Sequence, residues 1–69
     1  MPGTIRTIIV DDHPLIRQGL ASAIAAEDGI ELAGQADSAS RGVALIREEK
    51  PDIALIDIRL SDYPKTVSL

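Results

Sequence analysis

Two apolar runs in the chain end in aspartates, and these aspartates are the candidate functional residues. Asp11 and Asp12 follow Ile8-Ile9-Val10, and Asp57 follows residues 53–56, which read Ile-Ala-Leu-Ile. Such runs, rich in β-branched residues, predict strands buried on both faces, which are typical of parallel α/β sheets. Because functional groups in these sheets gather at the carboxyl ends of the strands, we expect the three carboxylates to converge on one pocket.

Converging carboxylates repel one another, and the repulsion favours a bound cation. Two unit charges about 5 Å apart cost roughly 3 kcal/mol at an effective dielectric constant near 20. Mg²⁺ removes this cost and prefers carboxylate and carbonyl oxygens together with waters. Asp11, Asp12 and Asp57 offer such oxygens, and the backbone carbonyl of Arg59 adds one if the loop turns back. A carboxylate can also be a nucleophile that forms an aspartyl phosphate, and Asp57 is the candidate acceptor.

Length and composition restrict the class of protein. The 69 residues allow one small domain, and a hydrophobic fraction of 45% is typical of a globular one. The sequence has no cysteine, which excludes disulfides and thiolate metal sites, and its net charge of −4 disfavours non-specific binding of nucleic acid. No apolar run approaches the roughly 20 residues of a membrane span, and no signal peptide is recognisable at the N-terminus. We therefore expect a cytoplasmic chain that binds neither membranes nor nucleic acid directly.

The hydrophobic pattern predicts strands and helices in alternation. Strands are expected at residues 5–10, 30–36 and 53–58, and helices from residue 14 to about 26 and from about 38 to 50. Right-handed crossovers place such β-α-β-α-β units in a parallel sheet. Alternation in residues 30–36, with Glu31 on one side, indicates an exposed or edge strand.

Helical spacing also predicts which helix faces are buried. The first stripe holds Leu15, Ile16, Gly19, Leu20, Ala23 and Ile24, and the second holds Gly42, Val43 and Ile46. Asp12 or His13 is expected to cap the first helix and Asp37 or Ser38 the second, while Gly29 suits a left-handed C-terminal position. One residue of the Asp11–Asp12 pair could therefore cap while the other binds metal. His13 itself is expected to be a surface or capping residue.

Residues 8–20 (IIVDDHPLIRQGL) and 51–60 (PDIALIDIRL) resemble the receiver domain of two-component response regulators, most closely the subgroup with a C-terminal helix-turn-helix domain. The resemblance covers about residues 5–62 and implies a partial flavodoxin-like fold with strand order 2-1-3. It implies phosphorelay signal transduction, in which a sensor histidine kinase phosphorylates Asp57 and the chain itself is not an enzyme. It also implies that Asp11, Asp12 and Asp57, with the Arg59 carbonyl, hold Mg²⁺.

The chain departs from the family pattern after the acceptor strand. Family members are roughly twice as long, and their fourth and fifth strands end in a Thr or Ser and a Lys that contact the phosphoryl group. Lys65 and Thr66 are the right residue types in the wrong place, and Ser61 replaces the usual Pro. We therefore expect a partial receiver domain at residues 1–62, truncated after the acceptor strand, with a non-matching tail at residues 63–69. Its phosphate-accepting activity could be lost through the truncation.

Of two other functions, one fits the residues and the other does not. In one, the chain is an interaction fragment that is not phosphorylated, and its exposed apolar strand edge pairs with itself or with receiver domains. This edge predicts a homodimer, and the interaction function should tolerate Asp57→Asn. In the other, the chain hydrolyses aspartyl phosphates, but such enzymes carry a second Asp two positions after the nucleophile, where this chain has Arg59.

Overall fold

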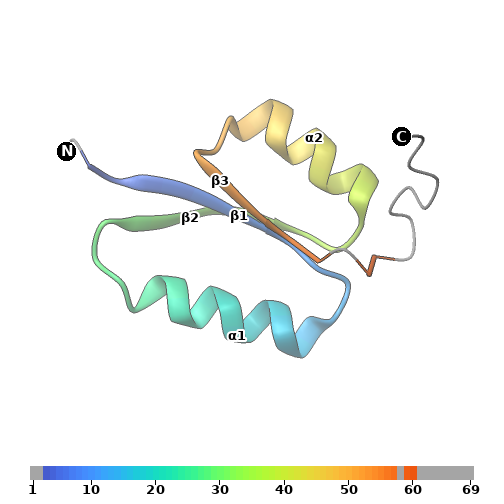
Figure 1. The fold of residues 1–69 in the computed structure, drawn as a ribbon, viewed down its shortest axis with the longest axis horizontal. Helices are drawn as coiled ribbons and strands as arrows, with labels where there is room; N and C mark the ends of the chain where they lie inside the picture. The colour runs from blue at the N-terminus through green and yellow to red at the C-terminus, as the bar shows by residue number, and fades with distance from the viewer. Residues whose placement is uncertain (1–2, 58, 61–69) are drawn as a thin grey trace, which may run out of the picture.

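A computed structural model describes residues 3–57 and 59–60 as a three-layered α/β unit (Figure 1). In chain order its elements are β1 (Ile5–Val10), α1 (Pro14–Ala25), β2 (Ile30–Ala36), α2 (Ala39–Glu49) and β3 (Ile53–Ile56). All five were predicted, with boundaries that differ by no more than two residues. The predicted tail at residues 63–69 lies outside the described residues.

The three strands form one parallel sheet in the order β2-β1-β3. Ile5–Val10 therefore lies in the centre, with β2 on one side and β3 on the other. Each crossover carries one helix, and α1 and α2 lie on opposite faces of the sheet (Figure 1). This arrangement confirms the expected α/β class with a partial flavodoxin-like fold.

The core is built around the apolar half of β1. Ile8, Ile9 and Val10 are at most 1% exposed, as expected for a central strand with a helix on either face. Ile8 and Val10 form one cluster with Ala36 and Leu60. On the α2 side the helix comes so close that a Cβ at Gly42 would lie 2.8 Å from Val10 Cγ1. Gly42 is therefore required by close packing, as its place in the predicted stripe suggested.

The predicted buried stripes are only partly correct. Ile24 and Gly42 are buried, but the exposed members are Leu15, Ile16, Gly19, Ala23, Val43 and Ile46. A Cβ at Gly19 would meet nothing within 4 Å, so this glycine does not serve close packing. The reason is that both helices pack on β1 and β2, which cover only part of each apolar stripe. Leu45, outside the predicted stripe, packs against the core cluster instead.

The helix ends confirm some of the predicted caps and correct others. Ser38 caps α2, since its Oγ accepts from the backbone N–H of Arg41 at 3.2 Å. His13 occupies the N-cap of α1 but makes no side-chain capping bond. Gly29 has the expected left-handed conformation, with φ of 84°, yet it belongs to the turn into β2 because α1 is capped earlier, at Ala26.

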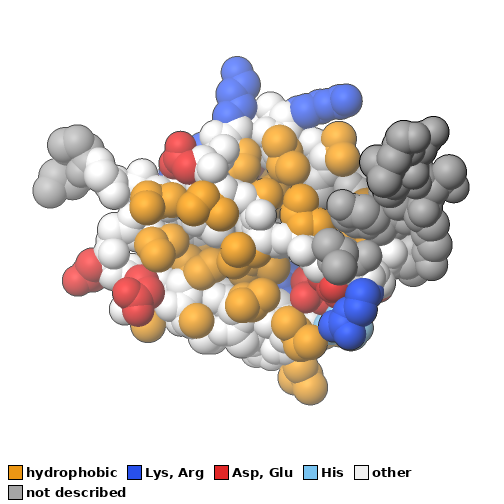
Figure 2. All heavy atoms as spheres, viewed as in Figure 1, with side chains coloured by type: hydrophobic (Ala, Val, Ile, Leu, Met, Phe, Trp, Pro, Cys, Tyr) orange, Lys and Arg blue, Asp and Glu red, His pale blue; other side chains and the backbone are white. Residues whose placement is uncertain are grey.

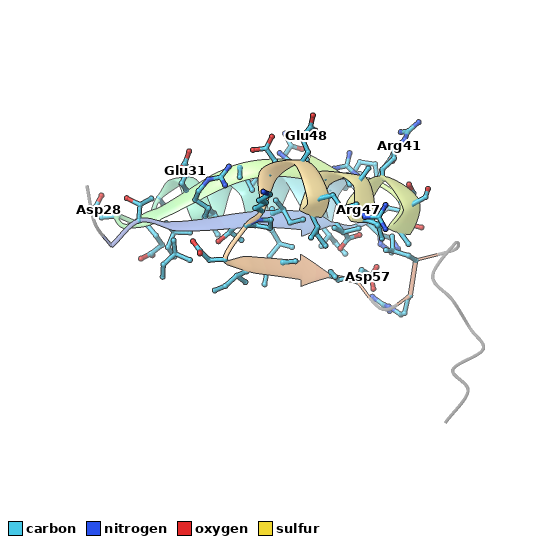
Figure 3. All side chains as sticks on the ribbon, turned by 90° about the horizontal axis from the view of Figure 1, so that it is seen from above. Asp28, Glu31, Arg41, Arg47, Glu48 and Asp57 are labelled. Atoms are coloured by element: carbon cyan, nitrogen blue, oxygen red, sulfur yellow. The ribbon has the colours of Figure 1, made fainter. Side chains whose placement is uncertain are left out.

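Strand β3 is an edge strand that neither helix covers (Figure 3). The apolar pattern taken alone predicted a strand buried on both faces, which is wrong for the described residues, whereas the exposed apolar edge that was also expected for this strand is found. Ile53, Leu55 and Ile56 are 47%, 40% and 43% exposed. Among the described residues, no helix is long and apolar enough to cross a membrane.

Candidate functional site

The two aspartate-bearing strand ends lie side by side. Val10, the last residue of β1, pairs with Ile56, the last residue of β3. The backbone N–H of Asp57 donates to the carbonyl of Val10 at 2.9 Å, and that of Asp11 donates to the carbonyl of Ala36 at 3.0 Å. Figure 3 shows Asp57 just beyond the tip of β3. Parallel pairing therefore brings Asp11 and Asp57 to the same edge of the sheet, 46 residues apart in sequence.

Asp11, Asp12, His13 and Asp57 form one compact cluster, called the acidic cluster below. Each residue contributes one potential ligand atom, and these atoms all lie within 4.8 Å of one another. The side chains of Asp11 and Asp57 are only 8% and 9% exposed, whereas that of Asp12 is 31% exposed. The predicted convergence of the three carboxylates is thus found in the structure.

His13 is the member of the cluster that sequence reasoning missed. Its Nδ1 lies 2.8 Å from Asp11 Oδ1, 3.1 Å from Asp12 Oδ1 and 3.3 Å from Asp57 Oδ2. The imidazole therefore lies against all three carboxylates, while its side chain stays 47% exposed as expected for a surface residue. The one available signal was its position directly after the aspartate pair, but spacing alone does not fix the direction of a side chain at an N-cap.

Asp11 and His13 shift each other's protonation. The pKa of Asp11 is lowered, chiefly because the backbone N–H of His13 donates to its carboxylate at 2.8 Å, while burial acts in the opposite direction. The pKa of His13 is raised from its ordinary value of 6.5, chiefly by the side-chain hydrogen bond with Asp11. In the metal-free protein a protonated His13 therefore partly neutralises the cluster.

This coupling predicts how the metal-free protein responds to pH. The folded-state pKa of His13 is raised, so its stabilising contribution is full below the unfolded value of 6.5 and is lost as the pH rises through the folded value. His13 is the only histidine, so its imidazole signals can be followed by NMR titration without overlap from another histidine. Without Mg²⁺ its pKa should lie above 6.5 and fall in Asp11→Asn, but not in Asp52→Asn. A pKa unaffected by Asp11→Asn would contradict the contact.

Two carboxylate oxygens in the acidic cluster indicate whether this site can hold a cation. Asp12 Oδ1 and Asp57 Oδ2 are buried and have no hydrogen-bond partner. Buried oxygens of this kind are costly unless a charge or donor satisfies them. A hard divalent cation such as Mg²⁺ prefers oxygen ligands of this type, so the donor set fits it. His13 Nδ1 lies close to both oxygens, which means that a cation would compete with the imidazole.

The remaining contacts fix the loops that carry the carboxylates. The backbone N–H of Arg59 donates to Asp57 Oδ1 at 2.9 Å, and its Nε lies 3.5 Å from the same oxygen. Arg17 Nη1 donates to the backbone carbonyl of Asp11 at 2.8 Å, which ties the end of β1 to α1. The role of the Arg59 carbonyl as a metal ligand stays a prediction.

Comparison with known proteins identifies the protein family to which this chain belongs. Residues 7–64 match the family model of the response regulator receiver domain, and the chain belongs to this family. It is similar to the response regulator GacA of Pseudomonas viridiflava, with 43% identity over 56 residues. It is also similar to the transcriptional regulatory protein LiaR of Bacillus subtilis, with 43% identity over 54 residues. These alignments cover 81% and 78% of this chain but 26% of each relative, so the chain spans about a quarter of their length.

Solved structures agree with this assignment. The signal receiver domain of NarL from Mycobacterium tuberculosis superposes with a TM-score of 0.84 at 34% identity, covering 88% of this chain and 49% of that one. A LuxR-family two-component response regulator from Aurantimonas superposes with a TM-score of 0.80 at 36% identity. The resemblance to receiver domains of response regulators, the modules of phosphorelay signalling, is therefore confirmed.

Proposed function

We propose that this chain is a phosphoacceptor module, in which Asp57 takes up a phosphoryl group with the help of Mg²⁺. The observation that carries the proposal is the convergence of Asp11, Asp12 and Asp57 at one sheet edge, with two buried carboxylate oxygens that have no hydrogen-bond partner. Membership of the receiver family supports it. By the same resemblance, the donor is a sensor histidine kinase in the cytoplasm, and the chain is a substrate of the transfer instead of a classical enzyme.

The two oxygens of Asp57 have different surroundings, and these suggest different roles. Oδ2 faces the acidic cluster, where Asp11, Asp12 and the Arg59 carbonyl would hold the cation with it. Oδ1 accepts the backbone N–H of Arg59, which fixes its direction. We assign the attack on phosphorus to Oδ1. An oxygen–phosphorus bond forms there, and the donor's bond to phosphorus breaks with its electron pair leaving on the donor.

The chain's own residues prepare this step. The hydrogen bond from Asp57 N–H to the Val10 carbonyl anchors the acceptor to the central strand. The nearly buried side chain of Asp57 excludes most competing water. When bound, Mg²⁺ supplies the positive charge that offsets the carboxylates and the incoming phosphoryl oxygens. His13 must give up its place beside Asp12 and Asp57, or lose its proton, to make room for this charge.

Metal dependence of the phosphoryl uptake tests the proposal. The chain is incubated with a small phosphodonor, once with Mg²⁺ and once with a chelator, and the intact mass is measured. One phosphoryl group should be gained with Mg²⁺ and none with the chelator. Uptake that is equal in both samples would show that the acidic cluster does not assist the transfer. Circular dichroism of both samples excludes unfolding as the cause of a lost adduct.

A further inference from the structure

The imidazole of His13 is a nitrogen donor within the acidic cluster, and the proposed function gives it no use. Figure 2 shows acidic, basic and histidine side chains gathered at one end of the molecule. A ring nitrogen carries one proton or one lone pair, and the hydrogen bond of Nδ1 goes to Asp11 Oδ1 at 2.8 Å. It therefore cannot also satisfy Asp12 Oδ1 and Asp57 Oδ2, which lie 3.1 Å and 3.3 Å away and have no hydrogen-bond partner.

The same four side chains are spaced like ligands around one cation. Two ligands bonded at about 2.1 Å lie about 3.0 Å apart at right angles and about 3.4 Å apart at the tetrahedral angle. The distances from His13 Nδ1 to the three carboxylate oxygens, 2.8–3.3 Å, are close to these values. The side chain of Asp57 is 9% exposed, so its unpartnered oxygen is buried and directed into the cluster. A cation held by the imidazole would also satisfy this oxygen.

The backbone of His13 is fixed on both sides of the ring. Its N–H donates to Asp11 Oδ1 at 2.8 Å, and its carbonyl accepts from the N–H of Arg17 at 2.9 Å. A ligand held in place before binding loses little conformational entropy when the metal binds. The position of His13 at the start of α1 therefore prepares the imidazole for coordination.

The nitrogen donor distinguishes between classes of cation. Carboxylate, carbonyl and water oxygens suit Mg²⁺, whereas imidazole suits borderline transition-metal ions such as Zn²⁺. Mg²⁺ gains little from the ring and must compete with it for the carboxylates. A borderline ion uses the ring as a ligand together with the carboxylates. The two kinds of cation should therefore respond in opposite directions when the imidazole is removed.

We propose that His13 Nδ1 is a metal ligand beside Asp11, Asp12 and Asp57, which gives the acidic cluster a preference for Zn²⁺ over Mg²⁺. The ring binds in its neutral form, with its remaining proton on Nε2. This inference rests on the cation site of the proposed function and adds a second class of cation to it. Bound Zn²⁺ would keep Mg²⁺ out of the site.

Calorimetric titrations with Zn²⁺ and with Mg²⁺, at one fixed pH and without a phosphodonor, test the proposal. The parent should bind Zn²⁺ more tightly than Mg²⁺. His13→Asn should weaken Zn²⁺ binding at least about tenfold, because changes merely beside a metal ligand already cost about 10- to 100-fold. The same variant should bind Mg²⁺ as tightly as the parent or more tightly, since Asn suits the N-cap and offers an oxygen in place of the imidazole.

Nitrogen-15 NMR of the parent supplies a second readout that does not need a variant. His13 is the only histidine, so its ring nitrogens are assigned without ambiguity. Zn²⁺ should move the signal of Nδ1 much further than that of Nε2. If circular dichroism shows that His13→Asn is unfolded, this measurement on the parent alone decides the question.

The control variant Asp52→Asn removes a carboxylate beside the opposite end of β3 and should keep the parent's affinity for both cations. Equal Zn²⁺ binding by the parent and folded His13→Asn, or a Nδ1 signal that bound Zn²⁺ does not move, would overturn the inference. If the parent still bound Mg²⁺, the proposed function would stand in either case. A parent that binds neither cation would overturn the cation site of both.

Discussion

Ile8→Ala should leave much of the chain unfolded at room temperature. Ile8 is fully buried in the central strand, and truncation of a buried Ile to Ala costs about 2–5 kcal/mol. A chain of this length has a total stability of roughly 3–10 kcal/mol, so the substitution removes a large part of it. Urea unfolding followed by circular dichroism should show a midpoint at much lower denaturant, or no folded baseline at all.

Leu15→Ala is the matched control for this core substitution. Leu15 belongs to the apolar stripe predicted for α1, yet its side chain is 82% exposed. Its truncation should change the free energy of unfolding by no more than about 0.5 kcal/mol. If Ile8→Ala and Leu15→Ala destabilised the chain equally, the placement of the core around β1 would be wrong.

Asp12→Asn should weaken Mg²⁺ binding about 10- to 100-fold. Asp12 Oδ1 is one of the two buried oxygens without a hydrogen-bond partner, and interactions of this kind with a charged group contribute about 1.5–3 kcal/mol. Calorimetric titration of the parent and the variant with Mg²⁺ measures the change. Asp52→Asn is the control, because it removes the same charge beside the opposite end of β3, where Asp52 accepts the backbone N–H of Arg6.

In the metal-free protein, the same substitution, Asp12→Asn, should raise the thermal stability. Above the pKa of His13 the imidazole is neutral, so removal of one carboxylate charge relieves repulsion within the acidic cluster. The thermal midpoint of Asp12→Asn should then be higher than that of the parent. A variant that binds Mg²⁺ as tightly as the parent, or that melts lower without metal, would show that the carboxylates do not act as one site.

The strand positions and the three aspartates could be predicted because they depend on local patterns. Uninterrupted apolar runs predicted β1 and β3, and parallel pairing then placed Asp11 and Asp57 at one edge. The buried helix faces were harder, since a stripe such as Val43 and Ile46 is buried only where the sheet extends beneath it.

The errors in the prediction involve features that only the assembled chain decides. The apolar pattern of residues 53–56 alone predicted a covered strand, and only the comparison with the longer family pattern led to the expectation of the exposed edge that β3 forms among the described residues. His13 was assigned to the surface or to a cap, yet its ring lies against three carboxylates. The contacts with Asp11 and Asp12 are local, but Asp57 comes from a distant strand, and no local rule contains that third contact.

Whether Asp57 is the phosphoacceptor is decided by the intact mass of two aspartate variants after incubation with Mg²⁺ and a small phosphodonor. Asp57→Asn removes the proposed acceptor after β3, and Asp52→Asn removes the aspartate before it. We expect one phosphoryl group on Asp52→Asn, as on the parent, and none on Asp57→Asn. A phosphoryl group on Asp57→Asn, or none on the folded parent, would contradict the assignment of Asp57 as the acceptor.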